Sequence, residues 1–231
     1  MKTIGLIGGM SWESTVLYYQ IINQTVKERL GGLHSAKLVL VSVDFHAVEK
    51  LQAAGAWDAA GELMAQAAKS LQAAGADLVL LCTNTMHKVA DAIEAAVEIP
   101  LLHIADPTAQ AIQRAGFKIV GLLGTRFTME QDFYRGRLIE RHGLEVIVPN
   151  QSDREIVHRV IYEELCRGKV REDSRQQYQR IIEALVRDGA EAIILGCTEI
   201  TMLLGADDSP VPVFDTTRLH SVEAVDWALA N

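Results

Sequence analysis

The chain has few cysteines, no excess of basic residues and no long apolar run, and each absence excludes a class of protein. Its 231 residues include only three cysteines, an odd number that favours a reducing compartment over a secreted disulfide framework. A formal net charge of −8 argues against binding to nucleic acid or an anionic membrane through bulk electrostatics. No stretch approaches the roughly eighteen apolar residues of a membrane helix, and the short apolar start does not fit a signal peptide. We therefore expect a cytoplasmic protein with no nucleic-acid or membrane partner.

Motifs for metals and nucleotides are also missing. The seven histidines show no metal-ligand spacing and the cysteines form no C-x-x-C pair, so no metal site is expected. The glycine-rich stretch GLIGGMSWES at residues 5–14 is neither G-x-G-x-x-G nor a P-loop, although Asp44 imitates the ribose-binding acid of dinucleotide folds. We predict instead that this stretch approaches a small ligand closely, with Met10 and Ser11 at its rim.

Short apolar runs alternate with longer amphipathic stretches, which predicts an α/β fold. The runs are apolar on both faces, the pattern of parallel strands covered by helices on both sides. The expected strands lie near residues 3–8, 37–44, 77–82, 100–104, 118–124, 143–149, 191–197 and 211–214.

The series of runs repeats itself. GLIGG at 5–9 corresponds to GLLGT at 121–125, and AAGADLVLLCTN at 73–84 corresponds to RDGAEAIILGCT at 187–198. The repeat predicts two pseudo-symmetric, Rossmann-like three-layer domains with parallel sheets, with the active site in the cleft between them. We expect one domain to comprise residues 1–105 plus 215–231, and the other residues 106–214.

In the register of this repeat, Thr83 corresponds to Cys197, so one copy has a hydroxyl where the other has a thiol. Cys197 ends a strand where a helix is expected to begin, and backbone N–H groups at a helix N-terminus favour a thiolate. Cys82 lies one residue before Thr83, and because side chains alternate along a strand, we expect it to face away from the cleft.

Neutral polar residues follow both positions. Asn84, Thr85 and Thr198 supply donors that can hold a carboxylate, and the same residue types also cap helices. His87, one turn further on, could orient or polarise the Thr83 side. Cys166 has no counterpart in the repeat and is interpreted as incidental.

Three motifs together resemble the cofactor-independent aspartate/glutamate racemases: GLIGGMSW at the start, TNTMH at 83–87 and GCTE at 196–199. The resemblance implies an amino-acid racemase, usually a homodimer, that uses neither pyridoxal phosphate nor a metal. In that family two cysteines flank the α-carbon of the substrate; one removes the α-proton and the other returns a proton to the opposite face. Here the first of these cysteines is Thr83.

The resemblance assigns Cys197 as the base that acts on L-amino acids and Thr83 as the residue on the opposite face. An alcohol is a far weaker acid than a thiol, so we expect L-substrates to be favoured. An enzyme cannot shift the equilibrium, so the preference must appear in rate and saturation. Aspartate and glutamate are the expected substrates, with other polar amino acids admitted if neutral Gln52 meets the substrate side chain. The implied substrate-binding residues are Met10, Ser11, Gln52, Asn84, Thr85, Thr198 and Glu199, with His87 and Lys169 in possible support.

Two alternatives remain open. A single cysteine is compatible with a decarboxylase or another isomerase of the same superfamily, which would protonate a carbanion from one side. A catalytically idle amino-acid-binding protein would also show the loss of one cysteine, although a binder has no need of the thiol of Cys197.

Overall fold

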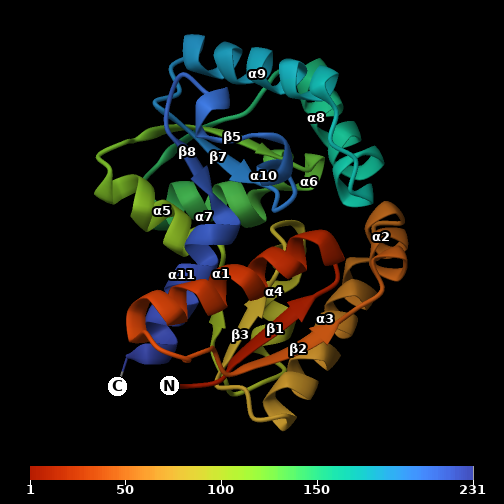
Figure 1. Cartoon of the computed structure of the whole chain (residues 1–231). Coiled ribbons are helices and arrows are strands. Elements are labelled where there is room, and N and C mark those ends of the chain that lie inside the picture. Colours follow the sequence, from red (N-terminus) through yellow and green to blue (C-terminus); the bar gives the residue numbers. More distant parts are fainter. Residues whose placement is uncertain (231) are drawn as a thin grey trace. The chain divides into compact units, whose positions relative to one another are not determined.

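The computed structural model describes residues 1–230, and their contacts divide into two compact units (Figure 1). Unit 1 contains Met1–Ile104 and the chain from His220 onward, and unit 2 contains Ala105–Leu219. The strands of unit 1 are β1 (Ile4–Gly8), β2 (Leu38–Ser42), β3 (Leu78–Leu81) and β4 (Leu101–Leu102). The strands of unit 2 are β5 (Ile119–Gly124), β6 (Glu145–Ile147), β7 (Ala192–Gly196) and β8 (Val213–Asp215). That each unit is an independent domain stays a prediction.

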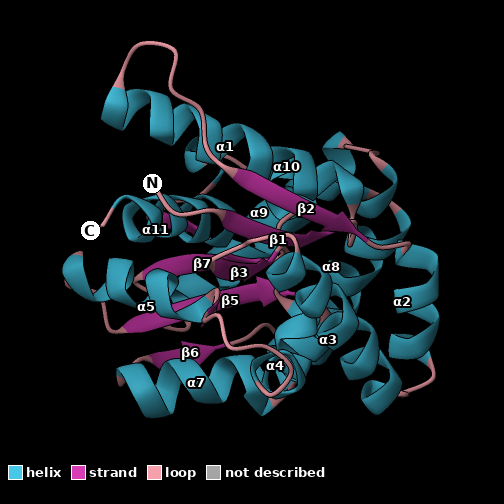
Figure 2. Cartoon of the chain, turned by 90° about the horizontal axis from the view of Figure 1, so that it is seen from below, coloured by secondary structure: helices cyan, strands magenta, loops and turns pink. Residues whose placement is uncertain are grey.

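Each unit carries a four-stranded parallel sheet, and the two sheets have the same topology. Their strand orders are β2-β1-β3-β4 and β6-β5-β7-β8. Figure 2 shows β1 and β2 side by side with their arrows pointing the same way, and Ile4 pairs with Leu38 in this register. The predicted α/β fold with two related parallel sheets is confirmed.

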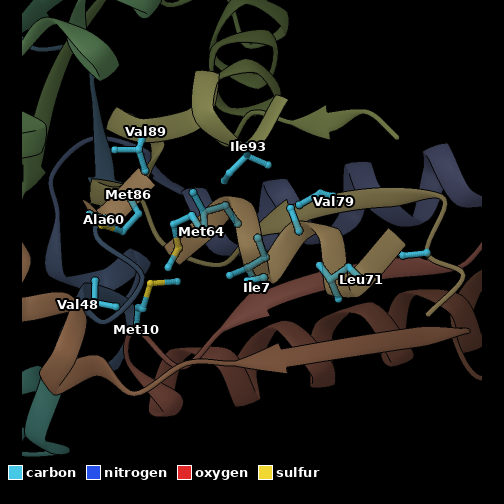
Figure 3. Packing of buried hydrophobic residues seen from close by; sticks show 14 residues of the cluster. Ile7, Met10, Val48, Ala60, Met64, Leu71, Val79, Met86, Val89 and Ile93 are labelled. Carbon is cyan, nitrogen blue, oxygen red and sulfur yellow. The ribbon is translucent and has the colours of Figure 1, made fainter. Parts of the chain in front are cut away.

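Helices cover both faces of the sheet of unit 1. They are α1 (Trp12–Leu30), α2 (Phe45–Ala53), α3 (Trp57–Ala73), the 3₁₀ helix η1 (Thr85–Val89), α4 (Ala90–Glu94) and, at the end of the chain, α11 (Thr216–Leu229). One core cluster joins apolar side chains of the sheet to those of α1 and α11. A second cluster, shown in Figure 3, joins the opposite face to α3, η1 and α4.

Strand β3 shows why a two-sided apolar run is required at this position. Leu78 and Leu80 pack in the cluster of α1 and α11, whereas Val79 and Leu81 pack in the cluster of α3. Cys82 continues the alternation and lies fully buried in the cluster of α1 and α11. This burial raises the pKa of its thiol far above the ordinary range, so Cys82 is a core residue.

Unit 2 repeats this construction. Its helices are α5 (Ala105–Arg114), α6 (Arg126–Glu130), α7 (Asp132–His142), α8 (Gln151–Glu163), η2 (Leu165–Arg167), α9 (Glu172–Arg187), α10 (Ile200–Leu203) and η3 (Ala206–Asp208). The Tyr178 hydroxyl of α9 donates to the Val157 carbonyl of α8 at 3.0 Å, which ties these two helices together. No helix in the described part of the chain is long and apolar enough to cross a membrane.

In each unit an acidic residue precedes the third strand, Asp77 before β3 and Glu191 before β7, and the structure explains why this residue recurs in the repeat. The Asp77 carboxylate accepts a hydrogen bond from the Thr3 backbone N–H at 2.7 Å. The Glu191 carboxylate accepts from the backbone N–H groups of Lys118 and Ile119 at 2.7 and 3.0 Å. Both carboxylates therefore satisfy backbone donors where β1 and β5 begin, so this element of the repeat is structural.

Asp106 connects α5 to α7 in unit 2 through a partly buried ion-pair network. Its carboxylate accepts two hydrogen bonds from the Arg137 guanidinium at 2.7 and 2.6 Å, and His142 Nε2 lies 3.0 Å from Oδ1. Burial opposes ionisation of this carboxyl, but the hydrogen bonds and charges of Arg137 and His142 outweigh it and lower the pKa of Asp106.

Asp106→Asn is expected to lower the free energy of unfolding by about 2 kcal/mol at neutral pH, because Arg137 loses its bidentate partner. A lowered folded-state pKa stabilises the protein above the unfolded-state pKa, and this stabilisation disappears as the pH falls through the folded-state value. The difference between variant and wild type, measured by urea unfolding, should therefore shrink in acid. Glu130→Gln, which breaks a more exposed pair with Arg154, is the control and should cost less than about 1 kcal/mol. A pH-independent difference for Asp106→Asn would contradict this account.

Candidate functional site

In unit 1 the candidate residues Thr83, Asn84 and Thr85 follow the carboxyl end of β3 and lead into η1. All three are buried, and 7% of Thr83 is exposed. The chain turns sharply at this point, because the Thr83 backbone N–H donates to the Leu81 carbonyl at 2.8 Å. This is the edge of a parallel sheet at which ligands bind in open α/β folds.

His87 holds this turn from within η1. Its Nδ1 lies 2.7 Å from the Thr83 carbonyl oxygen, and its Nε2 accepts from the Ile104 backbone N–H at 3.2 Å. A carbonyl oxygen can only accept and a backbone N–H can only donate, so these partners require a neutral imidazole with its proton on Nδ1. Both ring nitrogens are therefore engaged by the backbone, and His87 supports Thr83 by holding its carbonyl group.

The glycine-rich loop after β1 is held together by its own contacts. The Gly9 N–H donates to Thr15 Oγ1 at 2.8 Å, and the same hydroxyl donates to the Ser11 carbonyl at 2.7 Å. Gly9 has a φ of +93°, and a Cβ atom there would lie 2.2 Å from the Val43 carbonyl oxygen. The backbone after β2 therefore requires glycine at this position, and a close approach of the loop to a ligand stays a prediction.

Ser11, Met10 and Gln52 are all buried in unit 1. Ser11 is the N-cap of α1, where its Oγ accepts from the Ser14 backbone N–H at 3.4 Å. Met10 and Met86 belong to the core cluster of Figure 3. Gln52 Nε2 donates to the Met86 sulfur at 3.1 Å, so the structure brings Gln52 next to the segment that contains Thr83.

In unit 2, Cys197 directly follows β7, as Thr83 follows β3. Its side chain is 6% exposed, and its Sγ donates to Glu199 Oε2 at 2.9 Å. The Thr198 hydroxyl donates to the same carboxylate oxygen at 2.8 Å. A thiol that donates directly to a carboxylate has the geometry of a nucleophile or base paired with a proton acceptor.

The electrostatics of Cys197 differ from the expectation. Burial, and then the negative charge of Glu199, raise the pKa of its thiol well above the ordinary value. The Glu199 backbone N–H favours the thiolate, but this effect is smaller. The helix that was expected to stabilise a thiolate, α10, begins only at Ile200 and has four residues. The N-terminus of α10 therefore does not lie at Cys197, and burial and the charge of Glu199 favour the protonated thiol.

Two other residues of unit 2 were singled out from the sequence. Lys169 is exposed in the segment between η2 and α9, where its backbone N–H donates to the Glu164 carbonyl at 2.9 Å. Cys166 lies in η2, and its electrostatic interaction with Cys197 is one of the causes that raise the pKa of Cys197, so it belongs to the surroundings of that thiol. Among residues 1–230, no three His, Cys, Asp or Glu side chains gather in a way that could hold a metal ion.

The sequence did not predict that His103 and His220 would lie close to His87, or that Tyr18 would lie close to His220. The His87 ring centroid lies 4.4 Å from that of His103 and 6.0 Å from that of His220, and the Tyr18 hydroxyl lies 2.9 Å from His220 Nδ1. These residues belong to four separate segments, so no local spacing could have indicated the cluster.

Comparison with known proteins adds independent findings. The family model described as Asp/Glu/Hydantoin racemase matches residues 7–224. A structure from Yersinia pestis, provisionally described as an Asp/Glu racemase, is 61% identical, covers 100% of both chains and has a TM-score of 0.92. A structure of an aspartate racemase homologue from Pyrococcus horikoshii OT3 is 35% identical, again covers 100% of both chains and has a TM-score of 0.85. The broad specificity amino-acid racemase RacX of Bacillus subtilis (strain 168) is 26% identical over 166 residues, which are 71% of this chain and 70% of that protein.

Proposed function

The chain belongs to the Asp/Glu/Hydantoin racemase family and is an isomerase, and we propose that it inverts the α-carbon of aspartate, glutamate or related polar amino acids without a cofactor. The observation that carries this proposal is the buried Cys197 thiol, which donates to the Glu199 carboxylate at 2.9 Å. A binding protein has no need of a thiol with an adjacent proton acceptor, whereas proton abstraction from an α-carbon needs both.

Cys197 acts on the L-isomer in this proposal. Glu199 takes the thiol proton, and the resulting thiolate removes the α-proton of the substrate. The resting thiol avoids burying a second negative charge beside Glu199, whose charge already raises the pKa of Cys197. Assigning Glu199 as this proton acceptor refines the substrate-binding role expected from the sequence.

Thr83 serves the opposite face of the same α-carbon. It returns a proton to the carbanion through its hydroxyl, directly or by way of a water molecule, and the hydroxyl is restored by a proton from solvent. Because an alcohol is a poor base, abstraction from a D-amino acid on this side is slow. His87 supports this role by holding the Thr83 carbonyl at 2.7 Å.

Substrate binding is assigned to the polar and backbone groups around these two positions. Asn84, Thr85 and Thr198 hold the α-carboxylate, and Met10 and Ser11 line the site. Gln52 contacts the substrate side chain, with Lys169 in support. A neutral amide in this role is consistent with a broad range of polar substrates, as the name of the B. subtilis relative indicates for that protein.

The working form is a cytoplasmic homodimer in this proposal. The resemblance implies the dimer, and three free cysteines in residues 1–230 fit a reducing compartment. Light scattering of the purified protein measures the mass directly, and a monomer would contradict the proposed assembly.

Proton NMR in D₂O tests the proposed activity. L- and D-aspartate, L- and D-glutamate and other polar amino acids are each incubated with the protein without added cofactor. Loss of the α-proton signal of L-substrates, with chiral analysis showing D-product, is the expected result. The absence of exchange and inversion for every amino acid would overturn the proposal and favour the single-cysteine decarboxylase or the binding protein.

Glu199→Gln is expected to reduce the maximal rate of inversion by about 10²-fold, because the thiol loses its proton acceptor. Without this acceptor Cys197 must lose its proton to solvent, and burial, the largest cause of its raised pKa, remains in the variant. The activity of the variant should therefore rise with pH at a higher pH than that of the wild type, while its maximum falls. Glu183→Gln on the exposed surface of α9 is the control and should leave the pH profile unchanged. A Glu199→Gln variant as fast as the wild type would show that Glu199 is not the proton acceptor and that its charge only hinders formation of the thiolate.

A further inference from the structure

Unit 1 contains a buried cluster of three histidines at the two points where the chain leaves and re-enters this unit. His87 and His103 are nearly fully buried, and His220 has no exposed surface. The chain passes to unit 2 after Ile104 and returns at His220. His103 and His220 therefore mark the two crossovers, and His87 lies between them and Thr83.

The first crossover segment, residues 102–104, is held at both ends by histidine side chains. His220 Nε2 donates to the Leu102 carbonyl at 2.8 Å, and His87 Nε2 accepts from the Ile104 N–H at 3.2 Å. The His103 ring packs on that of His87 at 4.4 Å between centroids. Residues 102–104 are thereby fixed to both α11 and η1.

The second crossover is held from α1. The Tyr18 hydroxyl and His220 Nδ1 are 2.9 Å apart, and their rings meet edge to face. Because His220 Nε2 must donate to the Leu102 carbonyl, Nδ1 of a neutral His220 accepts a hydrogen bond from the Tyr18 hydroxyl. His220 therefore links α1, α11 and β4, and its ring packs edge to face against His87.

We propose that His87 and His220, with Tyr18, are positioning residues that fix the backbone of Thr83 and thereby make the return of a proton from the Thr83 side efficient. The inference rests on the proposed function of Thr83. His87 acts on Thr83 through the 2.7 Å hydrogen bond to its carbonyl, and His220 acts through the ring of His87 and through residues 102–104.

Geometry favours positioning over proton transfer. The His87 nitrogens are both engaged by backbone groups, and those of His220 by Tyr18 and Leu102, so the chain already uses the hydrogen-bonding sites of both rings. Reprotonation of a carbanion from one face depends steeply on where the donor lies, and a displacement of about 1 Å can cost about 10²-fold in rate. A rigid Thr83 backbone therefore affects inversion directly.

Two reactions of the same protein separate the Thr83 side from the Cys197 side. Inversion of L-aspartate needs proton removal by Cys197 and proton return from the Thr83 side. In 3-chloro-L-aspartate, the carbanion formed when the α-proton is removed expels chloride, and the enamine product tautomerises to an imine that water hydrolyses to an oxo acid and ammonia. Chloride release therefore reports on Cys197 without requiring Thr83 to donate a proton.

Tyr18→Phe, His220→Leu and His87→Leu are the test variants. Each is expected to lower the kcat of L-aspartate inversion about 10- to 100-fold while chloride release stays within about 2-fold, and KM for L-aspartate should change little. His87→Gln and His220→Gln restore a donor and an acceptor and should recover part of the inversion. Tyr18→Phe removes only one hydroxyl, so it keeps the test valid if a histidine variant does not fold.

His34→Gln is the matched control, because His34 is exposed and lies outside the cluster. Equal losses of inversion and chloride release, or no loss of inversion in Tyr18→Phe and the glutamine variants, would overturn the inference and leave the cluster with a structural role only. A wild-type protein with neither inversion nor chloride release would instead overturn the proposed function itself.

Discussion

Cys197→Ser is expected to reduce the inversion of L-aspartate by about 10⁴-fold, because the side chain that abstracts the α-proton becomes an alcohol. The thiol already has a raised pKa, through burial and the charge of Glu199, and a hydroxyl in the same surroundings would ionise with still greater difficulty. Chiral chromatography of the product and chloride release from 3-chloro-L-aspartate measure this loss, and both rates should fall together.

Ligand affinity shows whether the loss in Cys197→Ser comes from the chemical step or from weaker binding of the substrate. Calorimetric titration with L-aspartate should show similar binding in Cys197→Ser and wild type, since serine preserves the shape and the hydrogen bond to Glu199. Cys166→Ser is the matched control for the chemical change and is expected to keep most of the activity. Undiminished inversion in Cys197→Ser would exclude Cys197 as the base.

Thr83→Cys is expected to raise kcat from D-aspartate by about 10²-fold, because a thiol can form a base on the side where the wild type has an alcohol. The equilibrium constant between enantiomers is one, so kcat/KM must be equal in the two directions for any variant. The gain therefore appears as an equal rise of kcat/KM in both directions and as a kcat from the D-isomer that approaches that from the L-isomer.

Thr83→Ser separates acidity from size in this experiment. It keeps an alcohol and removes only a methyl group, so it should retain the preference of the wild type for L-substrates. If Thr83→Cys left kcat from D-aspartate unchanged, Thr83 would not be the group that limits the reaction on this face.

Much of the fold follows from local patterns in the sequence. The two-sided apolar runs predicted the parallel strands, because Leu80 and Leu81 must pack against helices on opposite faces of one sheet. The edge strands were predicted less well, since β4 comprises only Leu101–Leu102 where residues 100–104 were expected. The His220 side chain holds Leu102, the last residue of β4, and the His87 side chain holds the backbone of Ile104 beyond it.

The candidate site was predictable where it lies close along the chain. The correspondence of Thr83 with Cys197 was predicted from the repeat. In the structure Cys197 directly follows β7, and Thr83 lies one residue further on, after Cys82 at the end of β3. The electrostatic surroundings of Cys197 were predicted incorrectly, because the sequence shows that a helix follows but not that it has four residues or that the Glu199 carboxylate turns back to the thiol.

By itself the sequence determined the α/β class, the repeated sheet and the pair of positions at the strand ends, because each depends on hydrophobic periodicity and order within a short segment. Only the tertiary structure decided what surrounds those positions. The hydrogen bond between Tyr18 and His220 joins residues 202 positions apart, and that between His220 and Leu102 joins residues 118 positions apart. Such contacts form only when separate helices and strands pack on one sheet, and no local pattern of residues encodes them.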